Sequence, residues 1–168
     1  MRYWFTADMH FGHANIIKYH NRPYKSVEEM NYKLIKNWNQ LVKPEDYVIH
    51  VGDFASSYNK VDVDGIINKL NGHIIFIKGN HDFGRLFKIE ELLFIIGTKE
   101  VHVIHYPELA TRKYNIVGHV HNIYKSRLIR KGKQKRYFVN VGVDVWNYRP
   151  ISVETINKEF EKLIKESL

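Results

Sequence analysis

Polar motifs follow short β-type runs at five places along the chain, and this repeated placement constrains the fold more than any other feature. The groupings are Asp8-Met9-His10, Gly52-Asp53, Gly79-Asn80-His81-Asp82, His105 and Gly118-His119-Val120-His121. Each follows a run whose residues are typical of a strand. Ligands of α/β proteins bind outside the carboxyl ends of strands. The pattern therefore predicts a layered α/β domain with a polar site at the ends of its strands.

The first half of the chain alternates predicted strands and helices, and paired strands dominate the second half. Strands are expected over 2–7, 47–51, 73–78, 101–105 and 114–117, with a β-hairpin formed by 125–129 and 136–141. Helices are expected from the capping-box residue Ser26 to Pro44, over 64–70, around 86–94, and after Ser152. The 168 residues contain no repeat or low-complexity linker, so we expect one mixed α/β domain over 1–168.

Composition excludes some chemistries and favours others. The chain has no cysteine, which rules out disulfides, thiol nucleophiles and thiolate metal sites. Its 26 Lys and Arg against 18 Asp and Glu give a net charge of +8, which favours anionic partners. The apolar stretch before Asp8 is too short for a signal peptide, and the longest apolar runs are far shorter than the roughly 18 residues of a membrane span. We therefore expect a soluble, cytoplasmic protein with no membrane contact.

The five groupings together supply carboxylate, imidazole and amide oxygen ligands. This donor set suits divalent ions such as Mn²⁺, Fe²⁺ or Zn²⁺, and its size fits two ions. Alternation along an extended segment is expected to put Asp8 and His10 on one side, and His119 and His121 likewise, so that each pair grips a common centre. The glycines that precede three of the groupings are expected to form sharp turns. Each motif is weak alone, and their conjunction carries the inference.

The ordered series D-x-H, G-D, G-N-H-D, a lone His and G-H-x-H resembles the signature of the calcineurin-like metallophosphoesterase superfamily. The resemblance covers residues 8–121, continues through 140–144, and is closest to small bacterial and phage proteins described as predicted phosphoesterases, which share D-x-H-F-G-H. It implies a four-layer α-β-β-α sandwich in which two mixed sheets pack face to face, with metals at one edge. Phe54 after Asp53 and Asp82 after His81 separate the chain from the Ser/Thr phosphoprotein phosphatases of that superfamily.

The resemblance also implies a role for each matched residue. It implies that Asp8, His10 and His121 hold a first metal, that Asn80, His105 and His119 hold a second, and that Asp53 bridges the two. His81 would lie beside the ions without ligating them, as a catalytic group that stabilises the transition state or protonates the leaving oxygen. Asp82 would orient the His81 imidazole. Two divalent ions are the implied cofactors, with Mn²⁺ expected and Fe²⁺, Ni²⁺ or Zn²⁺ as alternatives.

Several other polar residues could have either a functional role or a purely structural one. His13 could contact a substrate phosphate from the loop that carries His10, or it could be a surface histidine. Arg22 suits bidentate phosphate binding, although an exposed arginine needs no function. Asp144 follows the last predicted strand and could either line the pocket or pack. No role is assigned to His20, His50, His73 and His102.

These observations favour a dinuclear-metal hydrolase of phosphate esters, acting on a small or nucleotide-like phosphodiester or phosphomonoester. One alternative is a non-catalytic scaffold that keeps the fold and the metal, which the retention of His81 argues against. Another is a basic nucleic-acid-binding module or nuclease that uses the charged hairpin at 127–136, although most charged hairpins are solvated edges. The natural substrate, the preference for monoesters or diesters, the native metal and the oligomeric state stay open.

Overall fold

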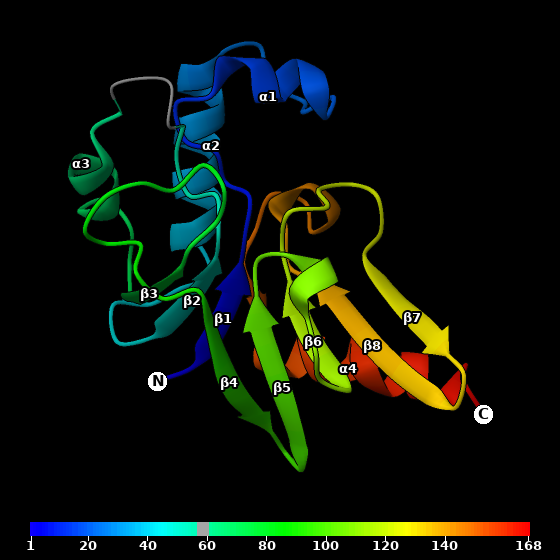
Figure 1. The fold of residues 1–168 in the computed structure, drawn as a ribbon. Coiled ribbons are helices and arrows are strands. Elements are labelled where there is room, and N and C mark those ends of the chain that lie inside the picture. The colour runs from blue at the N-terminus through cyan, green and yellow to red at the C-terminus, as the bar shows by residue number, and fades with distance from the viewer. Residues whose placement is uncertain (57–60) are drawn as a thin grey trace.

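Two mixed β-sheets pack face to face in the computed structural model, which describes residues 1–56 and 61–168 (Figure 1). The smaller sheet has the order β3-β2-β1-β9 and is formed by β1 (Tyr3–Thr6), β2 (Tyr47–Val51), β3 (His73–Ile77) and β9 (Ile151–Ser152). Its first three strands run parallel, and β9 runs antiparallel to β1. The carboxyl ends of β1, β2 and β3 therefore lie at one edge.

The larger sheet repeats this arrangement on the other side of the core. It has the order β4-β5-β6-β8-β7, with β4 (Glu91–Ile96), β5 (Lys99–Ile104), β6 (Tyr114–Val117), β7 (Ser126–Lys131) and β8 (Gln134–Asn140). Strands β5, β6 and β8 are parallel, whereas β4 and β7 are antiparallel to their neighbours. An isolated bridge between Ala7 and Gly142 joins the segments that follow β1 and β8. The ends of the parallel strands of both sheets thus come together.

The helices α2 (Val27–Asn39) and α3 (Val63–Ile67) cover the outer face of the smaller sheet. The short helix α1 (Ala14–Tyr19) lies beyond the carboxyl ends of the strands (Figure 1). The predicted start of α2 at Ser26 is confirmed, because the Ser26 side chain accepts from the Glu29 backbone N–H. The Glu29 carboxylate accepts from the backbone N–H of Lys25, one residue before the cap, instead of from that of Ser26. The apolar face of α2, including the fully buried Leu34 and Trp38, packs in one cluster with outward-facing residues of the sheet.

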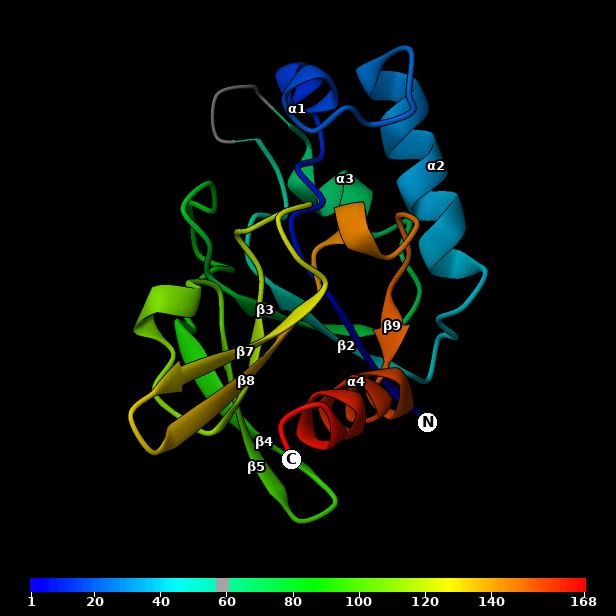
Figure 2. The same cartoon turned by 90° about the vertical axis from the view of Figure 1, so that its right-hand side faces the viewer.

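The core between the sheets is made of alternate residues of the same strands. Phe5 and Ile49 of the smaller sheet share a cluster with Val103 and Ile116 of the larger one. The last helix, α4 (Val153–Lys165), begins after its predicted cap Ser152 and contributes Phe160 to this same cluster. Figure 2 shows α4 beside β9, across the β7–β8 pair of the larger sheet. This arrangement confirms the expected mixed α/β fold with two mixed sheets.

Two local features differ from the sequence-based expectation. The helix expected around 86–94 is wrong, since β4 occupies Glu91–Ile96 and pairs with β5. The short helix α1 was not expected, and the side chain of His13 caps its amino terminus. Among the described residues, no helix combines the length and apolar character that crossing a bilayer requires.

Candidate metal centre

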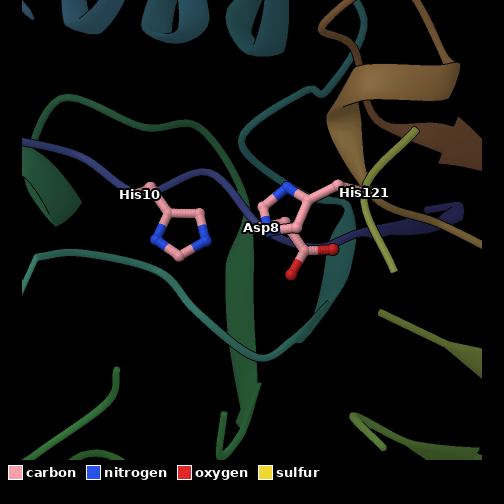
Figure 3. A group of neighbouring side chains, drawn as sticks. All are labelled: Asp8, His10 and His121. Carbon is pink, nitrogen blue, oxygen red and sulfur yellow. The ribbon is translucent and has the colours of Figure 1, made fainter. Parts of the chain in front are cut away.

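The five predicted groupings converge where the parallel strands of the two sheets end. Their donor atoms form three overlapping groups, and within each group the atoms lie within 4.8 Å of one another. The groups are Asp8, His10 and His121; His10, Asp53 and His81; and Asp53, His105 and His119. Figure 3 shows the first of them, in which His121 comes from a segment far from Asp8 and His10 in sequence. Shared members link the three groups into one continuous centre.

The backbone at this centre is turned into the left-handed region at non-glycine residues. Five site residues have positive φ: Asp8 at 57°, His10 at 52°, Asp53 at 59°, His119 at 70° and His121 at 44°. Such angles are uncommon outside glycine, and in native proteins they concentrate at functional sites. The backbone at both pairs is therefore not extended, so alternation is not what aligns them. The expectation that Asp8 and His10 face a common centre is confirmed all the same, because their donor atoms lie in one group.

The two histidines of Gly118-His119-Val120-His121 consequently lie in different groups. His121 joins Asp8 and His10, whereas His119 joins Asp53 and His105. The prediction from alternation that His119 and His121 share one centre is wrong for the described structure. The division between two groups is the arrangement that the family resemblance implies.

Asn80 adds an amide oxygen to the group of Asp53, His105 and His119. Its Oδ1 lies 3.2 Å from Nε2 of His105 and 3.1 Å from Nδ1 of His119. The Nδ1 atom of His105 lies 2.9 Å from the carbonyl oxygen of Val51, which can only accept a hydrogen bond. Nδ1 of His105 therefore carries a proton, and Nε2 faces the other donors, as in metal-ligating histidines.

Close packing explains two of the glycines. A Cβ atom at Gly52 would collide with the His105 ring, and Gly52 also has a φ of +86°. A Cβ atom at Gly79 would collide with the carboxylate and backbone of Asp53, although Gly79 does not have a positive φ. The sharp turn expected from the sequence is present at Gly52, while Gly79 is needed for space.

Asp82 fastens the two loops that carry Asp53 and Asn80. Its buried carboxylate accepts hydrogen bonds from the backbone N–H groups of Asp53 at 2.7 Å, Phe54 at 2.8 Å and Gly79 at 2.9 Å. The expected contact of this carboxylate with the His81 imidazole is replaced by these three backbone contacts. We therefore propose that Asp82 is a positioning residue for the loops.

Arg22 lies behind the centre, and its predicted contact with a substrate phosphate is wrong. The side chain is fully buried and forms a bidentate pair with Asp144, with Nε to Oδ1 at 2.9 Å and Nη2 to Oδ2 at 3.0 Å. Its remaining contacts are the carbonyl oxygens of Asp8 and Met9 and the sulfur of Met30. All five guanidinium N–H groups thus have acceptors, and none is left for a substrate.

Asp144 is a site-supporting residue whose role the sequence did not resolve. Its Oδ2 lies 2.9 Å from Nδ1 of His121, so it connects Arg22 to a member of the first group. A carboxylate on one ring nitrogen fixes the orientation of a histidine and leaves Nε2 for a ligand. The only sequence signal was its place after a strand, at the short helix Val143–Val145.

Replacing Arg22 with methionine is expected to lower the free energy of unfolding by about 3–5 kcal/mol, because the buried carboxylate of Asp144 loses its cation. Urea denaturation of the metal-free protein measures this loss. Arg85→Met, at an exposed arginine, serves as the control and should be nearly neutral. Adding Asp144→Asn to the first variant should recover part of the loss. Unchanged stability in Arg22→Met would contradict the structural role.

Charged groups in the centre strongly perturb one another. Burial raises the pKa of Asp8 to about 6, although the charges of His105 and His121 oppose the shift. Burial would also raise the pKa of Asp53, but the contact with His105 and the His105 charge outweigh it and hold that pKa well below its usual range. For His105, burial lowers the pKa, but Asp53 and Asp8 raise it overall to about 9. Burial and the interaction between carboxylates and histidines therefore determine the pKa values of these groups together.

Metal affinity is expected to rise with pH. Asp8 and His105 must lose their protons to bind a cation, and their pKa values are about 6 and about 9. Binding at pH 7 should therefore release protons, and affinity should increase from pH 6 to pH 8. Calorimetric titration with Mn²⁺ in buffers of different ionisation enthalpy measures both quantities. Affinity that does not change with pH would show that these two groups are not ligands.

The residues present fit a divalent cation. Within residues 1–56 and 61–168, both ring nitrogens of His10 are buried without a hydrogen-bond partner, although buried polar atoms in native proteins are nearly always paired. Nε2 of His10 lies 3.5 Å from Oδ2 of Asp53, and Nε2 of His105 lies 3.5 Å from the same oxygen. Imidazole nitrogens and carboxylate oxygens that surround one point are the donors of Mn²⁺, Fe²⁺ and Zn²⁺ sites.

A recess of about 590 Å³ opens beside the first group. It is lined by His13 and His81, and by His20, for which the sequence predicted no role. The His20 ring stacks on that of His121 with centroids 3.7 Å apart. Nδ1 of His13 accepts from the backbone N–H of Ile16 at 3.3 Å, so neutral His13 carries its proton on Nε2. No spacing rule in the sequence links His20 to His121.

Comparisons with known proteins agree with the geometry. The model of the calcineurin-like phosphoesterase superfamily domain matches residues 1–153. The uncharacterized protein MJ1445 of Methanocaldococcus jannaschii is 41% identical over 167 residues, covering 95% of this chain and 91% of that protein. The Gene 66 protein of Mycobacterium phage L5 is 36% identical over 81 residues, covering 47% of this chain and 39% of the phage protein.

A solved structure shows the same fold. The crystal structure of AQ665, a protein of unknown function from Aquifex aeolicus, superimposes with a TM-score of 0.70 at 24% identity, covering 94% of this chain and 98% of that one. The family model and the ordered motifs cover most of the chain, and their residues meet in one centre. The chain belongs to the calcineurin-like phosphoesterase superfamily.

Proposed function

We propose that this chain is a divalent-metal-dependent phosphoester hydrolase whose substrate is a small or nucleotide-like phosphodiester or phosphomonoester. The observation that carries the proposal is the set of three overlapping donor groups, together with the buried His10 ring, whose nitrogens form no hydrogen bond with the described residues. In this proposal Asp8, His10 and His121 hold one ion, and Asn80, His105 and His119 hold another. Asp53 would be their shared ligand, because its Oδ2 lies 3.5 Å from Nε2 of His10 in the first set and 3.5 Å from Nε2 of His105 in the second.

Divalent ions held by these residues would supply a nucleophile at neutral pH and neutralise developing charge on the phosphoryl oxygens. The chain's own residues position the substrate around them. The backbone N–H of His81 donates to Oδ1 of Asp53 at 2.8 Å, which fixes His81 beside the shared carboxylate. Its ring lies 5.0 Å from the His10 ring and lines the recess. From there the His81 imidazole can donate a proton to the leaving oxygen or stabilise its charge.

Hydrolysis of bis-p-nitrophenyl phosphate beside p-nitrophenyl phosphate tests the proposal directly. Chelator-stripped protein should be inactive, and added Mn²⁺ should restore cleavage of at least one ester. The ratio of the two rates distinguishes a phosphodiesterase from a phosphomonoesterase. Filled metal sites without cleavage of either ester would instead support the scaffold function.

The basic hairpin lies away from the proposed centre. Its tip at Gly132 precedes β8, whereas the centre lies beyond the carboxyl end of that strand (Figure 1). Arg130 and Lys135 donate to the carbonyl oxygen of Ser167, and Arg136 donates to that of Ala110. Several of these cations thus have contacts within the fold.

Neutralising Lys131, Lys133 and Lys135 together as glutamines should leave the hydrolysis of a small aryl phosphate ester unchanged, because the hairpin tip is remote from the centre. Steady-state kinetics of the triple variant and the wild type measure the comparison. A large fall in kcat would place the hairpin in the active site. Salt-dependent nucleic-acid binding that survives chelation and disappears in the variant would favour the nucleic-acid-binding function instead.

A further inference from the structure

A second recess, of about 650 Å³, lies beside the other end of the centre. Its walls include Phe83 from the loop after β3 and Leu109 from the short helix Pro107–Leu109. Asn80 and Tyr106 form its inner side. Figure 1 shows that the loop after β3 and the segment around 107–109 both lie beyond the ends of the strands, as the centre does.

This second recess borders the group of Asp53, His105 and His119 through Asn80 and Tyr106. Asn80, which lines it, lies within 3.2 Å of nitrogens of both histidines. The Tyr106 ring has its centroid 4.9 Å from that of His105 and 4.9 Å from that of His119. Tyr106 therefore contacts both histidines and also lines the recess that Phe83 lines.

Two apolar side chains of this recess, Phe83 and Leu109, lie outside the core. Phe83 is 71% exposed and Leu109 is 57% exposed, and neither belongs to a core cluster of the described residues. Exposed apolar side chains that gather at a pocket beside a reactive centre are typical of ligand-binding sites. Phe83 and Tyr106 offer ring faces and edges on which a planar group can stack.

Charge favours an uncharged occupant over a second phosphate. Glu90 and Glu91 lie on the wall together with the buried Asp82, while Lys78 is the cation among the residues that line the recess. Oε2 of Glu91 lies 2.9 Å from Nε2 of His102. A further anionic group in this recess would face an excess of carboxylates, whereas an aromatic ring would not.

We propose that the substrate is a phosphodiester in which one ester group carries a planar aromatic ring, such as a nucleobase, and that Phe83, Tyr106 and Leu109 hold this ring. The inference rests on the proposed hydrolase function and narrows it. The two recesses adjoin opposite ends of the linked donor groups, one at His10 and His121 and one at Asn80. A phosphodiester at the centre has two ester groups, one for each recess, and the histidine-lined recess takes the second.

Two esters with the same leaving group test this inference. The p-nitrophenyl ester of thymidine 5′-phosphate carries a nucleobase, whereas methyl p-nitrophenyl phosphate does not. With Mn²⁺, the wild type should prefer the thymidine ester in kcat/KM by at least about tenfold, consistent with base stacking on an aromatic side chain. Phe83→Ala should reduce this preference about tenfold, chiefly through KM. Tyr32→Ala, an exposed aromatic residue on α2, should keep it.

A binding measurement separates this inference from the proposed hydrolysis. Thymidine 5′-phosphate should bind the Mn²⁺-loaded Phe83→Ala protein about tenfold more weakly than the wild type in calorimetric titration. If neither ester is cleaved but this difference is present, the hydrolase proposal fails and the aromatic recess stands. Equal kcat/KM for the two esters in the wild type, or equal binding by both proteins, would overturn the recess proposal.

Discussion

Replacing Asp53 with asparagine is expected to weaken metal binding and to reduce turnover by more than about 100-fold. Loss of an outer-shell contact alone typically costs 10–100-fold in metal affinity or activity, and Asp53 is proposed as a direct ligand of both ions. The substitution keeps the size of the side chain and an Oδ1 atom that can accept from the His81 backbone N–H. It removes the negative charge between His10 and His105. The effect should therefore come from lost ligation rather than from misfolding.

The measurement combines metal analysis after equilibrium dialysis with hydrolysis of bis-p-nitrophenyl phosphate. Circular dichroism checks that the variant is folded, and Asp64→Asn, at an exposed aspartate of α3, is the matched control with normal values expected. A variant that keeps both full metal content and full turnover would contradict the assignment of Asp53 as a ligand shared by the two ions. Loss of only one ion would place Asp53 in a single site.

The location of the centre could be predicted because it depends on chain order alone. Asp8, Asp53 and Asn80 follow strands that run parallel in one sheet, and His105 and His119 follow parallel strands in the other. Parallel neighbours present their carboxyl ends at the same edge, so residues after the strands gather without further information. Recognising the strands and the motifs that follow them in the sequence is therefore sufficient to predict where the centre lies.

The division of the donors into groups could not be predicted from spacing. His119 and His121 lie in different groups, whereas Asp8 and His10, which have the same spacing and also positive φ, share one group. The burial of Arg22 could not be predicted from local sequence either, because its partner Asp144 lies 122 positions later. Pair geometry between distant segments depends on how the two sheets pack, which motif spacing does not encode.

The misassigned segment shows why a local pattern was insufficient. Residues of β4 do not alternate between polar and apolar, because Leu93 and Ile95 are exposed on an apolar strand. Apolar residues on both faces look like a helix in a short window. The strand forms because β4 pairs with β5 along its whole length, from Glu91 opposite Ile104 to Ile96 opposite Lys99. Tertiary pairing overrides the local signal there.

Replacing His81 with alanine is expected to leave the metal sites filled and to reduce turnover by about 10²–10⁴-fold, the usual contribution of a general acid or base. His81 lines the recess beside the first group and stands next to Asp53 through its backbone contact. Its donor atom also lies within 4.8 Å of donor atoms of His10 and Asp53, which is close enough for a ligand. Metal analysis of His81→Ala therefore decides whether His81 is a catalytic group or an additional metal ligand. Loss of metal in this variant would show that His81 is a ligand.

The leaving group separates the two catalytic roles of His81. If the imidazole protonates the leaving oxygen, His81→Ala should harm the hydrolysis of a phenyl ester, which leaves as a basic phenoxide, more than that of a p-nitrophenyl ester. If it stabilises charge on the phosphoryl oxygens, both esters should slow equally. His73→Ala, at an exposed histidine at the start of β3, should cleave both at the wild-type rate. Full activity of His81→Ala on both esters would leave catalysis to the metal ligands alone and would remove His81 from the proposed mechanism.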